Sequence, residues 1–220
     1  MPNYVTGDLR DQLAHAGRSV VSAGLVVGSG GNLSARVPGA DTIWVTGAGT
    51  WLDRLTRPDF CQVRLGDGAV VGAGTTAPTT ELPLHLATYR ARPDVSAVIH
   101  LHPQTALLLD ALGERIRLVS TDHVYYLRDI VTTPFRLPGG AELAEIAAGA
   151  AATGTNCVLL AHHGCSVLGD SVELAHKRAL YLEEAAQLTY RALAAGLLAV
   201  LPDGPADYSA ALARDDTVSA

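Results

Sequence analysis

Apolar residues recur along much of the chain at the spacing of amphipathic helices. Leu9, Leu13 and Val20 lie on one face of the first such segment. Similar patterns predict five helices in all: 8–25, 79–90, 104–112, 141–152 and 171–198. Asp170 can cap the last of these helices, with Glu173 at its third position as in a capping box.

Short runs of β-branched and apolar residues predict strands between these helices. The predicted strands are 42–46, 60–65, 69–71, 95–100, 116–119, 124–127, 130–133 and 157–161. Gly66, Asp67 and Gly68 indicate a hairpin turn between the second and third of them. Helices and strands interleave, so the fold class is α/β. Because several strands are joined by tight turns, we expect a sheet that is at least partly antiparallel.

The composition is that of a globular protein, with 48% apolar and 17% charged residues among 220. No internal repeat or linker divides the chain, so we expect one domain over residues 1–220, with a polar, mobile tail from about residue 201. The formal net charge of −6 argues against nucleic acid as a partner, because phosphate backbones attract basic surfaces. No apolar run approaches the roughly 20 residues that cross a bilayer, so we expect no membrane partner.

The chain has three cysteines, Cys61, Cys157 and Cys165. Their number is odd and no C-x-x-C pair occurs, which argues against a disulfide framework. Thiols that remain reduced are typical of the cytoplasm, where we expect this protein.

Two histidines, His100 and His102, lie at the end of a predicted buried strand. Side chains two apart on a strand point to the same face, so both imidazoles can reach one ion. A second predicted strand ends at His162 and His163, before Gly164, and either histidine can supply a third ligand. Three neutral imidazoles suit zinc, with a position open for water or substrate.

A single carboxylate, Glu81, lies in the first turn of the helix predicted at 79–90. A carboxylate there favours the helix dipole in any protein. Because Glu81 and His85 are four apart on one helix face, they can also ligate a metal together. Glu81 can also act as a general base that is held near the ion.

Small polar loops supply candidate anion-binding groups. Glycine-rich segments at 30–32 and 47–49 expose backbone N–H groups, and Thr79 and Thr80 offer hydroxyls at a helix N-terminus. Helix starts and glycine nests bind phosphate. The glycines at 28–31 are not a dinucleotide fingerprint, because they follow a helix instead of opening a strand-to-helix turn.

Four segments in order resemble the class II aldolase and adducin family, of the fuculose-phosphate aldolase type. They are GGNLSAR (30–36), VTGAG (45–49), APTTELPLHLATYRARPDVSAVIHLHP (77–103) and LLAHHG (159–164). The resemblance spans about residues 7–198. It implies a three-layer α/β/α sandwich around a mainly antiparallel sheet, and commonly a cyclic homotetramer with active sites between subunits.

The resemblance also assigns site residues by matched position. It places His100, His102 and His163 on the zinc ligands, so that His163 and not His162 is the expected third ligand, and Glu81 on the catalytic acid/base. The matched phosphate-binding positions are Asn32, Gly49, Thr79 and Thr80.

The implied reaction is retro-aldol cleavage of a ketose 1-phosphate, resembling fuculose 1-phosphate, to dihydroxyacetone phosphate and an aldehyde. The metal, Zn2+ or another divalent ion such as Mn2+ or Co2+, stabilises the enediolate, and Glu81 moves the proton at its carbon. The same scaffold also serves epimerases, dehydratases and decarboxylases of sugar phosphates. In adducin-like relatives it is an interaction domain.

Two departures from the family pattern keep these alternatives open. Ala48 stands where the family has a serine or threonine, so one phosphate-binding hydroxyl is missing. The segment 120–126 aligns with neither the aldolases, which have a tyrosine acid near here, nor the epimerases, which have an aspartate. Candidate second acids in this segment are Asp122, His123, Tyr125 and Tyr126.

Overall fold

The computed structural model describes residues 4–72 and 76–204, and most of the tail expected from about residue 201 lies outside them. Seven strands form within the described residues: β1 Asn32–Ala35, β2 Thr42–Thr46, β3 Phe60–Arg64, β4 Ala97–Leu101, β5 Val131–Thr133, β6 Cys157–Leu160 and β7 Gly164–Gly169. The α-helices are α1 Leu9–Ser22, α2 Leu82–Ala91, α3 Gln104–Ala111, α4 Thr121–Leu127, α5 Ala141–Ala151 and α6 Val172–Ala194. Short 3-10 helices occur at Leu52–Arg54, Arg57–Asp59 and Leu198–Val200.

The strands form one sheet in the order β3-β2-β1-β4-β7-β6-β5. Every neighbouring pair is antiparallel except β5 and β6, so the expected mainly antiparallel sheet is confirmed. β4 lies between β1 and β7, with His100 opposite Asn32 on one side and opposite Ser166 on the other. The end of β4 that carries the histidines is therefore held from both sides.

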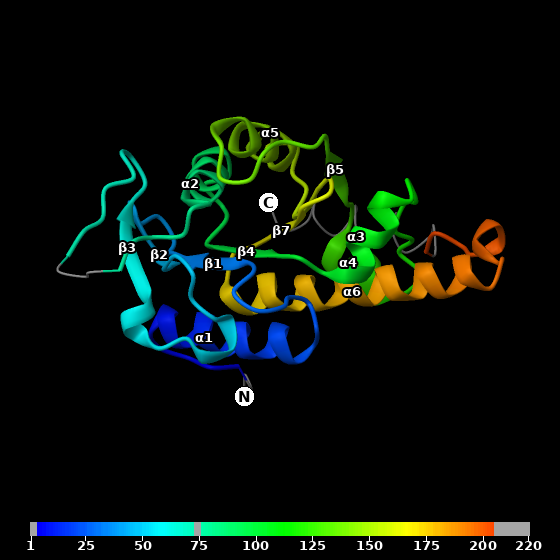
Figure 1. Cartoon of the computed structure of the whole chain (residues 1–220), viewed down its shortest axis with the longest axis horizontal. Helices are drawn as coiled ribbons and strands as arrows, with labels where there is room; N and C mark the ends of the chain where they lie inside the picture. Colours follow the sequence, from blue (N-terminus) through cyan, green and yellow to red (C-terminus); the bar gives the residue numbers. More distant parts are fainter. Residues whose placement is uncertain (1–3, 73–75, 205–220) are drawn as a thin grey trace, which may run out of the picture.

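Helices cover both faces of the sheet, which confirms the α/β/α sandwich (Figure 1). α2 and α5 pack together on one face, while α1 and α6 pack on the other, with α3 and α4 against α6. Two apolar cores result, one on each face. Adjacent residues of β4 belong to different cores, because successive side chains on a strand point to opposite faces. Val98 lies in the core beneath α2 and α5, and Ile99 lies in the core beneath α1 and α6.

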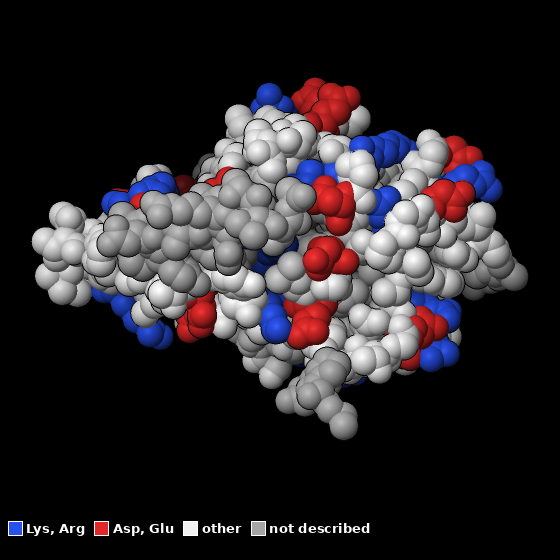
Figure 2. All heavy atoms as spheres, turned by 180° about the vertical axis from the view of Figure 1, so that it is seen from behind, with Lys and Arg blue, Asp and Glu red and all other residues white. Residues whose placement is uncertain are grey.

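The surface carries mixed charge. On the face shown in Figure 2, Lys and Arg side chains are interspersed with Asp and Glu side chains and do not gather into one basic area. Close ion pairs occur between Arg92 and Asp94 and between Lys177 and Glu173. Among the helices of residues 4–72 and 76–204, none combines the length and the apolar character that crossing a bilayer requires.

The strand predicted at 124–127 is wrong, because these residues belong to helix α4. The Ser120 hydroxyl accepts a hydrogen bond from the His123 N–H, which caps the helix. Val124 and Leu127 are three apart and both buried, so one helix face meets the core. The local preference of Val-Tyr-Tyr-Leu for a strand is overridden by the cap and by packing against α6.

Other differences from the predicted elements are smaller. No strand forms at 116–119, and the second arm of the predicted hairpin is reduced to a bridge between Val63 and Val70. The sequence does not predict β1 and β7, because their polar and glycine residues interrupt the apolar, β-branched pattern that is typical of a strand. The cap of α6 is Ser171 and not Asp170, because the Ser171 hydroxyl accepts from the Leu174 N–H.

We predict that Gly164→Ala destabilises the fold. A Cβ at this position would collide with the Leu101 carbonyl oxygen and lie 2.6 Å from His102 Cδ2. Overpacking of this kind costs about 1–3 kcal/mol, which urea unfolding measures. The matched control is Gly149→Ala in α5, where the new methyl group meets open space and helix propensity should raise stability by roughly 0.5–1 kcal/mol. Equal stability of the two variants would contradict the close approach of β7 to β4.

Candidate metal centre

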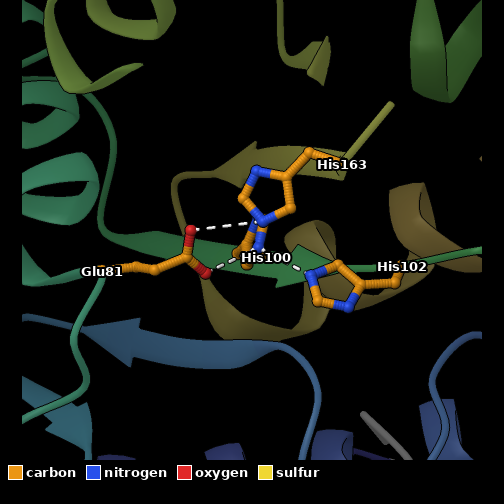
Figure 3. Close-up of side chains that lie close together, drawn as sticks. All are labelled: Glu81, His100, His102 and His163. Atoms are coloured by element: carbon orange, nitrogen blue, oxygen red, sulfur yellow. Dashed lines mark hydrogen bonds and ion pairs between the residues drawn. The ribbon is translucent and has the colours of Figure 1, made fainter. Parts of the chain in front are cut away.

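Four side chains from three separate parts of the fold converge at one end of the sheet (Figure 3). His100 lies in β4 and His102 directly follows that strand. His163 lies in the turn between β6 and β7, and Glu81 immediately precedes α2. Their candidate ligand atoms all lie within 4.8 Å of one another, so one ion can contact all four groups.

The imidazoles present the same nitrogen to the centre of this group. His100 Nε2 lies 3.1 Å from His102 Nε2 and 2.9 Å from Glu81 Oε2. His163 Nε2 lies 3.3 Å from Glu81 Oε1. Glu81 Oε1 is buried and accepts no hydrogen bond from the described residues. A set of lone pairs facing one point, with an unsatisfied buried carboxylate oxygen among them, fits a divalent cation.

The electrostatics of the site favour neutral His102 and His163 beside an ionised Glu81. Burial, together with the charges on His100 and His163, lowers the pKa of His102 to about 4. Burial likewise lowers the pKa of His163. Burial alone would raise the pKa of Glu81, but hydrogen bonds from His100 and Asn32 outweigh it and lower that pKa to about 2. Neutral histidine and ionised carboxylate are the forms that bind metal.

The turn after β6 decides between His162 and His163. His162 adopts a left-handed conformation with φ 56°, and its N–H donates to Asp110 Oδ2 at 2.9 Å. The His162 side chain is exposed and lies near Phe135, with ring centroids 6.3 Å apart. Because the chain reverses at this residue, His163 faces the other two histidines and His162 does not.

His85 does not join the group, although it follows Glu81 by one helical turn. Its Nε2 lies 2.5 Å from Asn32 Oδ1, and its Nδ1 lies 2.6 Å from Ser34 Oγ. Both nitrogens are engaged in these hydrogen bonds, so the alternative in which Glu81 and His85 ligate a metal together is wrong. Full burial lowers the pKa of His85 to about 3, which keeps the ring neutral.

A cavity of about 230 Å3 opens beside the four side chains. Its lining includes Glu81 and His102 together with the four predicted phosphate-binding residues, Asn32, Gly49, Thr79 and Thr80. Gly49 and Thr80 are exposed on the cavity wall, while Asn32 and Thr79 are buried. Gly49 has φ +72°, a conformation that favours glycine. The loops that are expected to bind an anion therefore share one cavity with Glu81 and His102.

The four candidate acids of segment 120–126 lie elsewhere in this chain, on α4 against α6. His123 is fully buried, with Nε2 3.2 Å from Glu184 Oε2. Asp122 accepts from the Tyr181 hydroxyl at 3.3 Å, and Tyr126 stacks on Tyr181 with centroids 4.7 Å apart. Tyr125 is 48% exposed. None of the four lines the cavity beside Glu81.

One hydrogen bond at the site was not anticipated from the sequence. Asn32 Nδ2 donates to Glu81 Oε2 at 2.9 Å, although the two residues are 49 positions apart. The sequence indicates a loop with exposed backbone N–H groups around Asn32, and the family resemblance a phosphate-binding position, but neither indicates a contact with Glu81. The pairing of β1 with β4 is what brings Asn32 opposite His100 and into reach of Glu81.

Comparison with known proteins places these observations in context. The family model described as the class II aldolase and adducin N-terminal domain matches residues 11–190. An L-fuculose phosphate aldolase from Methanococcus maripaludis is 32% identical over 165 residues, covering 75% of this chain and 87% of the relative. A 3-oxo-tetronate 4-phosphate decarboxylase from Haemophilus influenzae is 32% identical, covering 82% and 86%. The solved structure of an L-fuculose 1-phosphate aldolase superposes with a TM-score of 0.84 at 25% identity, covering 97% and 98%.

We predict that His163→Ala abolishes tight binding of a divalent ion, whereas His162→Ala leaves it unchanged. Removal of an outer partner of a metal ligand already costs about 10–100-fold in affinity, so loss of a ligand should cost more than about 100-fold. Elemental analysis of the purified chain and titration with Zn2+, Mn2+ and Co2+ measure the effect. Equal affinity in the two variants would show that His163 is not a ligand.

Proposed function

This chain belongs to the class II aldolase and adducin family, and on that basis we propose that it is a metal-dependent lyase that cleaves a ketose 1-phosphate to dihydroxyacetone phosphate and an aldehyde. The observation that carries the proposal is the position of Glu81. Its carboxylate lies between His100 and His163 and lines the same cavity as the glycine and threonine loops. The candidate metal ligands, proton carrier and anion-binding groups thus lie next to one another.

The ion would be held by His100, His102 and His163. When bound, it supplies positive charge that stabilises the negative charge developing on substrate oxygens as the carbon–carbon bond breaks. The lowered pKa values of His102 and His163 and the buried, unsatisfied oxygen of Glu81 support this assignment. The family resemblance extends the proposal to zinc as the ion and to a homotetramer, which elemental analysis and light scattering can test.

Glu81 would move a proton at the substrate carbon that becomes electron-rich on cleavage. Its low pKa makes it a carboxylate, the form that accepts a proton in the reverse, bond-forming direction. Its position 7% exposed at the cavity wall limits competition from water. Asn32 Nδ2 holds one oxygen, which fixes the direction in which the other oxygen points.

The phosphate would lie against the loops around Gly49 and Thr79. Gly49 is exposed on the loop after β2, so its backbone N–H is open to an anion, whereas the Ala48 N–H donates to the Ala77 carbonyl oxygen at 2.9 Å. Thr79 accepts a hydrogen bond from the Glu81 N–H at 3.3 Å, which links the phosphate loop to the carboxylate. Thr80 offers an exposed hydroxyl beside it. The alanine at 48 leaves this subsite one hydroxyl short of the family pattern.

A decarboxylase is the second candidate. The relative from Haemophilus influenzae carries that name at the same identity as the aldolase relative, and the altered loop at Ala48 is where the anion of a different substrate would bind. The metal ligands and Glu81 would serve either reaction, because both leave an electron-rich carbon next to a carbonyl. The two are separated by product mass, since decarboxylation leaves one product lighter than the substrate by carbon dioxide, whereas aldol cleavage gives two smaller products, dihydroxyacetone phosphate and an aldehyde.

We predict release of dihydroxyacetone phosphate when the metal-loaded chain meets a ketose 1-phosphate. Fuculose, rhamnulose and 5-deoxyribulose 1-phosphates form the test panel, and a coupled assay for dihydroxyacetone phosphate measures the product. The unphosphorylated sugars are the control and should react far more slowly, because the loop subsite then stays empty. If no member of the panel releases dihydroxyacetone phosphate with metal bound, the aldolase proposal is wrong.

We predict that Glu81→Gln retains the metal but lowers kcat by about 10²–10⁴-fold, the usual contribution of a positioned proton carrier. The imidazoles remain in place, so ion affinity should change little. Glu145→Gln, an exposed position on α5, is the matched control and should behave as the wild type. Near-native turnover of Glu81→Gln would remove Glu81 from the mechanism.

A further inference from the structure

A continuous chain of hydrogen bonds runs from the core to Glu81. The Tyr89 hydroxyl lies 3.0 Å from Ser34 Oγ, which lies 2.6 Å from His85 Nδ1. On the other side of the ring, His85 Nε2 lies 2.5 Å from Asn32 Oδ1, and Asn32 Nδ2 donates to Glu81 at 2.9 Å. All five side chains are buried.

This series of hydrogen bonds forms because a helix and a strand place side chains at nearly the same intervals. Glu81, immediately before α2, and His85 and Tyr89 within it follow one another at intervals of four residues, a rise of about 6 Å per step in a helix. Asn32 and Ser34 are two residues apart on β1, a rise of about 6.6 Å. The side chains of the two elements therefore interleave, so that Asn32, His85 and Ser34 each lie between two side chains of the other element.

The donors in this series of hydrogen bonds can point in one direction only. A carboxylate accepts and does not donate, so the amide nitrogen of Asn32 must face Glu81. The amide oxygen of Asn32 then faces His85 and needs a proton on Nε2. In the neutral ring Nδ1 is left as an acceptor, which takes the Ser34 hydroxyl proton, and the Ser34 oxygen accepts from Tyr89.

We propose that His85 is a positioning residue, which holds the carboxamide of Asn32 in the one orientation that gives Glu81 a donor. Ser34 and Tyr89 select the tautomer of His85 that does this. Without the Nε2–H of His85, the carboxamide can rotate and set its oxygen against the Glu81 carboxylate, which repels it. The catalytic consequence rests on the proposed role of Glu81, whereas the orientation itself does not.

The hydrogen bond from Asn32 to Glu81 becomes more important once an ion is bound. His100 Nε2 is the other group that lies 2.9 Å from Glu81 Oε2, and it cannot donate there once its lone pair is used for an ion. Asn32 is then the remaining side-chain donor to that oxygen among the described residues. The orientation of Asn32 therefore decides whether that oxygen of Glu81 keeps a side-chain donor in the loaded protein.

The first test measures the tautomer and needs no activity. Nitrogen NMR of the full, zinc-loaded chain with labelled histidine should show His85 neutral, with the proton on Nε2. The His85 signals are identified as those missing from the spectrum of His85→Gln. A proton on Nδ1, or on both nitrogens, would overturn the proposal. This result stands even if the chain cleaves no ketose 1-phosphate, so failure of the proposed function is distinguishable.

The second test compares His85→Gln with His85→Leu. Glutamine keeps one donor for Asn32 and one acceptor for Ser34, whereas leucine keeps neither. We expect His85→Leu to lower kcat by about 10–100-fold with KM and zinc affinity nearly unchanged, and His85→Gln to recover most of kcat. A purely structural role predicts loss of kcat in proportion to loss of stability, with no rescue by glutamine, and that outcome would overturn the proposal.

A third variant, Ser34→Ala, avoids the larger change of volume at His85. It removes the hydroxyl that donates to Nδ1 and leaves every group that touches Glu81 in place. The tautomer of His85 should then become mixed in the nitrogen spectrum, and kcat should fall by less than in His85→Leu. An unchanged tautomer in Ser34→Ala would show that Ser34 does not select it.

Discussion

A buried carboxylate is stable in this fold only while donors or a cation surround it. Glu81 is 7% exposed, and an ionised carboxylate at such a position needs compensation, since desolvation alone is costly. The compensating groups come from β1, from the end of β4 and from the turn between β6 and β7. This one requirement ties together strands far apart in the sequence and the helix α2, so the site and the sheet depend on each other.

Close approach of backbone segments is the second requirement, and glycine meets it. A Cβ at Gly30 would lie 3.0 Å from His102 Nδ1, and one at Gly31 would lie 2.7 Å from the His100 carbonyl oxygen. Gly31 also has φ +73°, which disfavours other residues. The same glycines that favour anion binding in the loop thus let β1 pack against the histidine strand. A substitution there would affect the candidate metal ligands and the candidate anion-binding loop together.

The proposed chemistry of the site and its proposed choice of substrate rest on different parts of the chain. His100, His102, His163 and Glu81 are held by the sheet and by α2, and they suit any reaction that leaves negative charge beside a carbonyl. The loop that contains Ala48 is exposed and departs from the family pattern. Relatives of similar identity carry aldolase and decarboxylase names, which is consistent with a constant centre and a variable loop.

The sequence by itself determined the fold class, most of the helices and the candidate group of three histidines and Glu81, because those depend on local periodicity and on residue types that few other roles explain. It failed for α4, where a cap and packing on α6 override strand preference, and for β1 and β7, which are strands because β4 lies between them. Only the tertiary structure decided that His163 faces the group while His162 turns outward, since a left-handed residue reverses the chain there. It alone also revealed the link from Tyr89 to Glu81, because hydrogen bonds between a strand and a helix some 50 residues apart follow from packing and not from spacing along the chain.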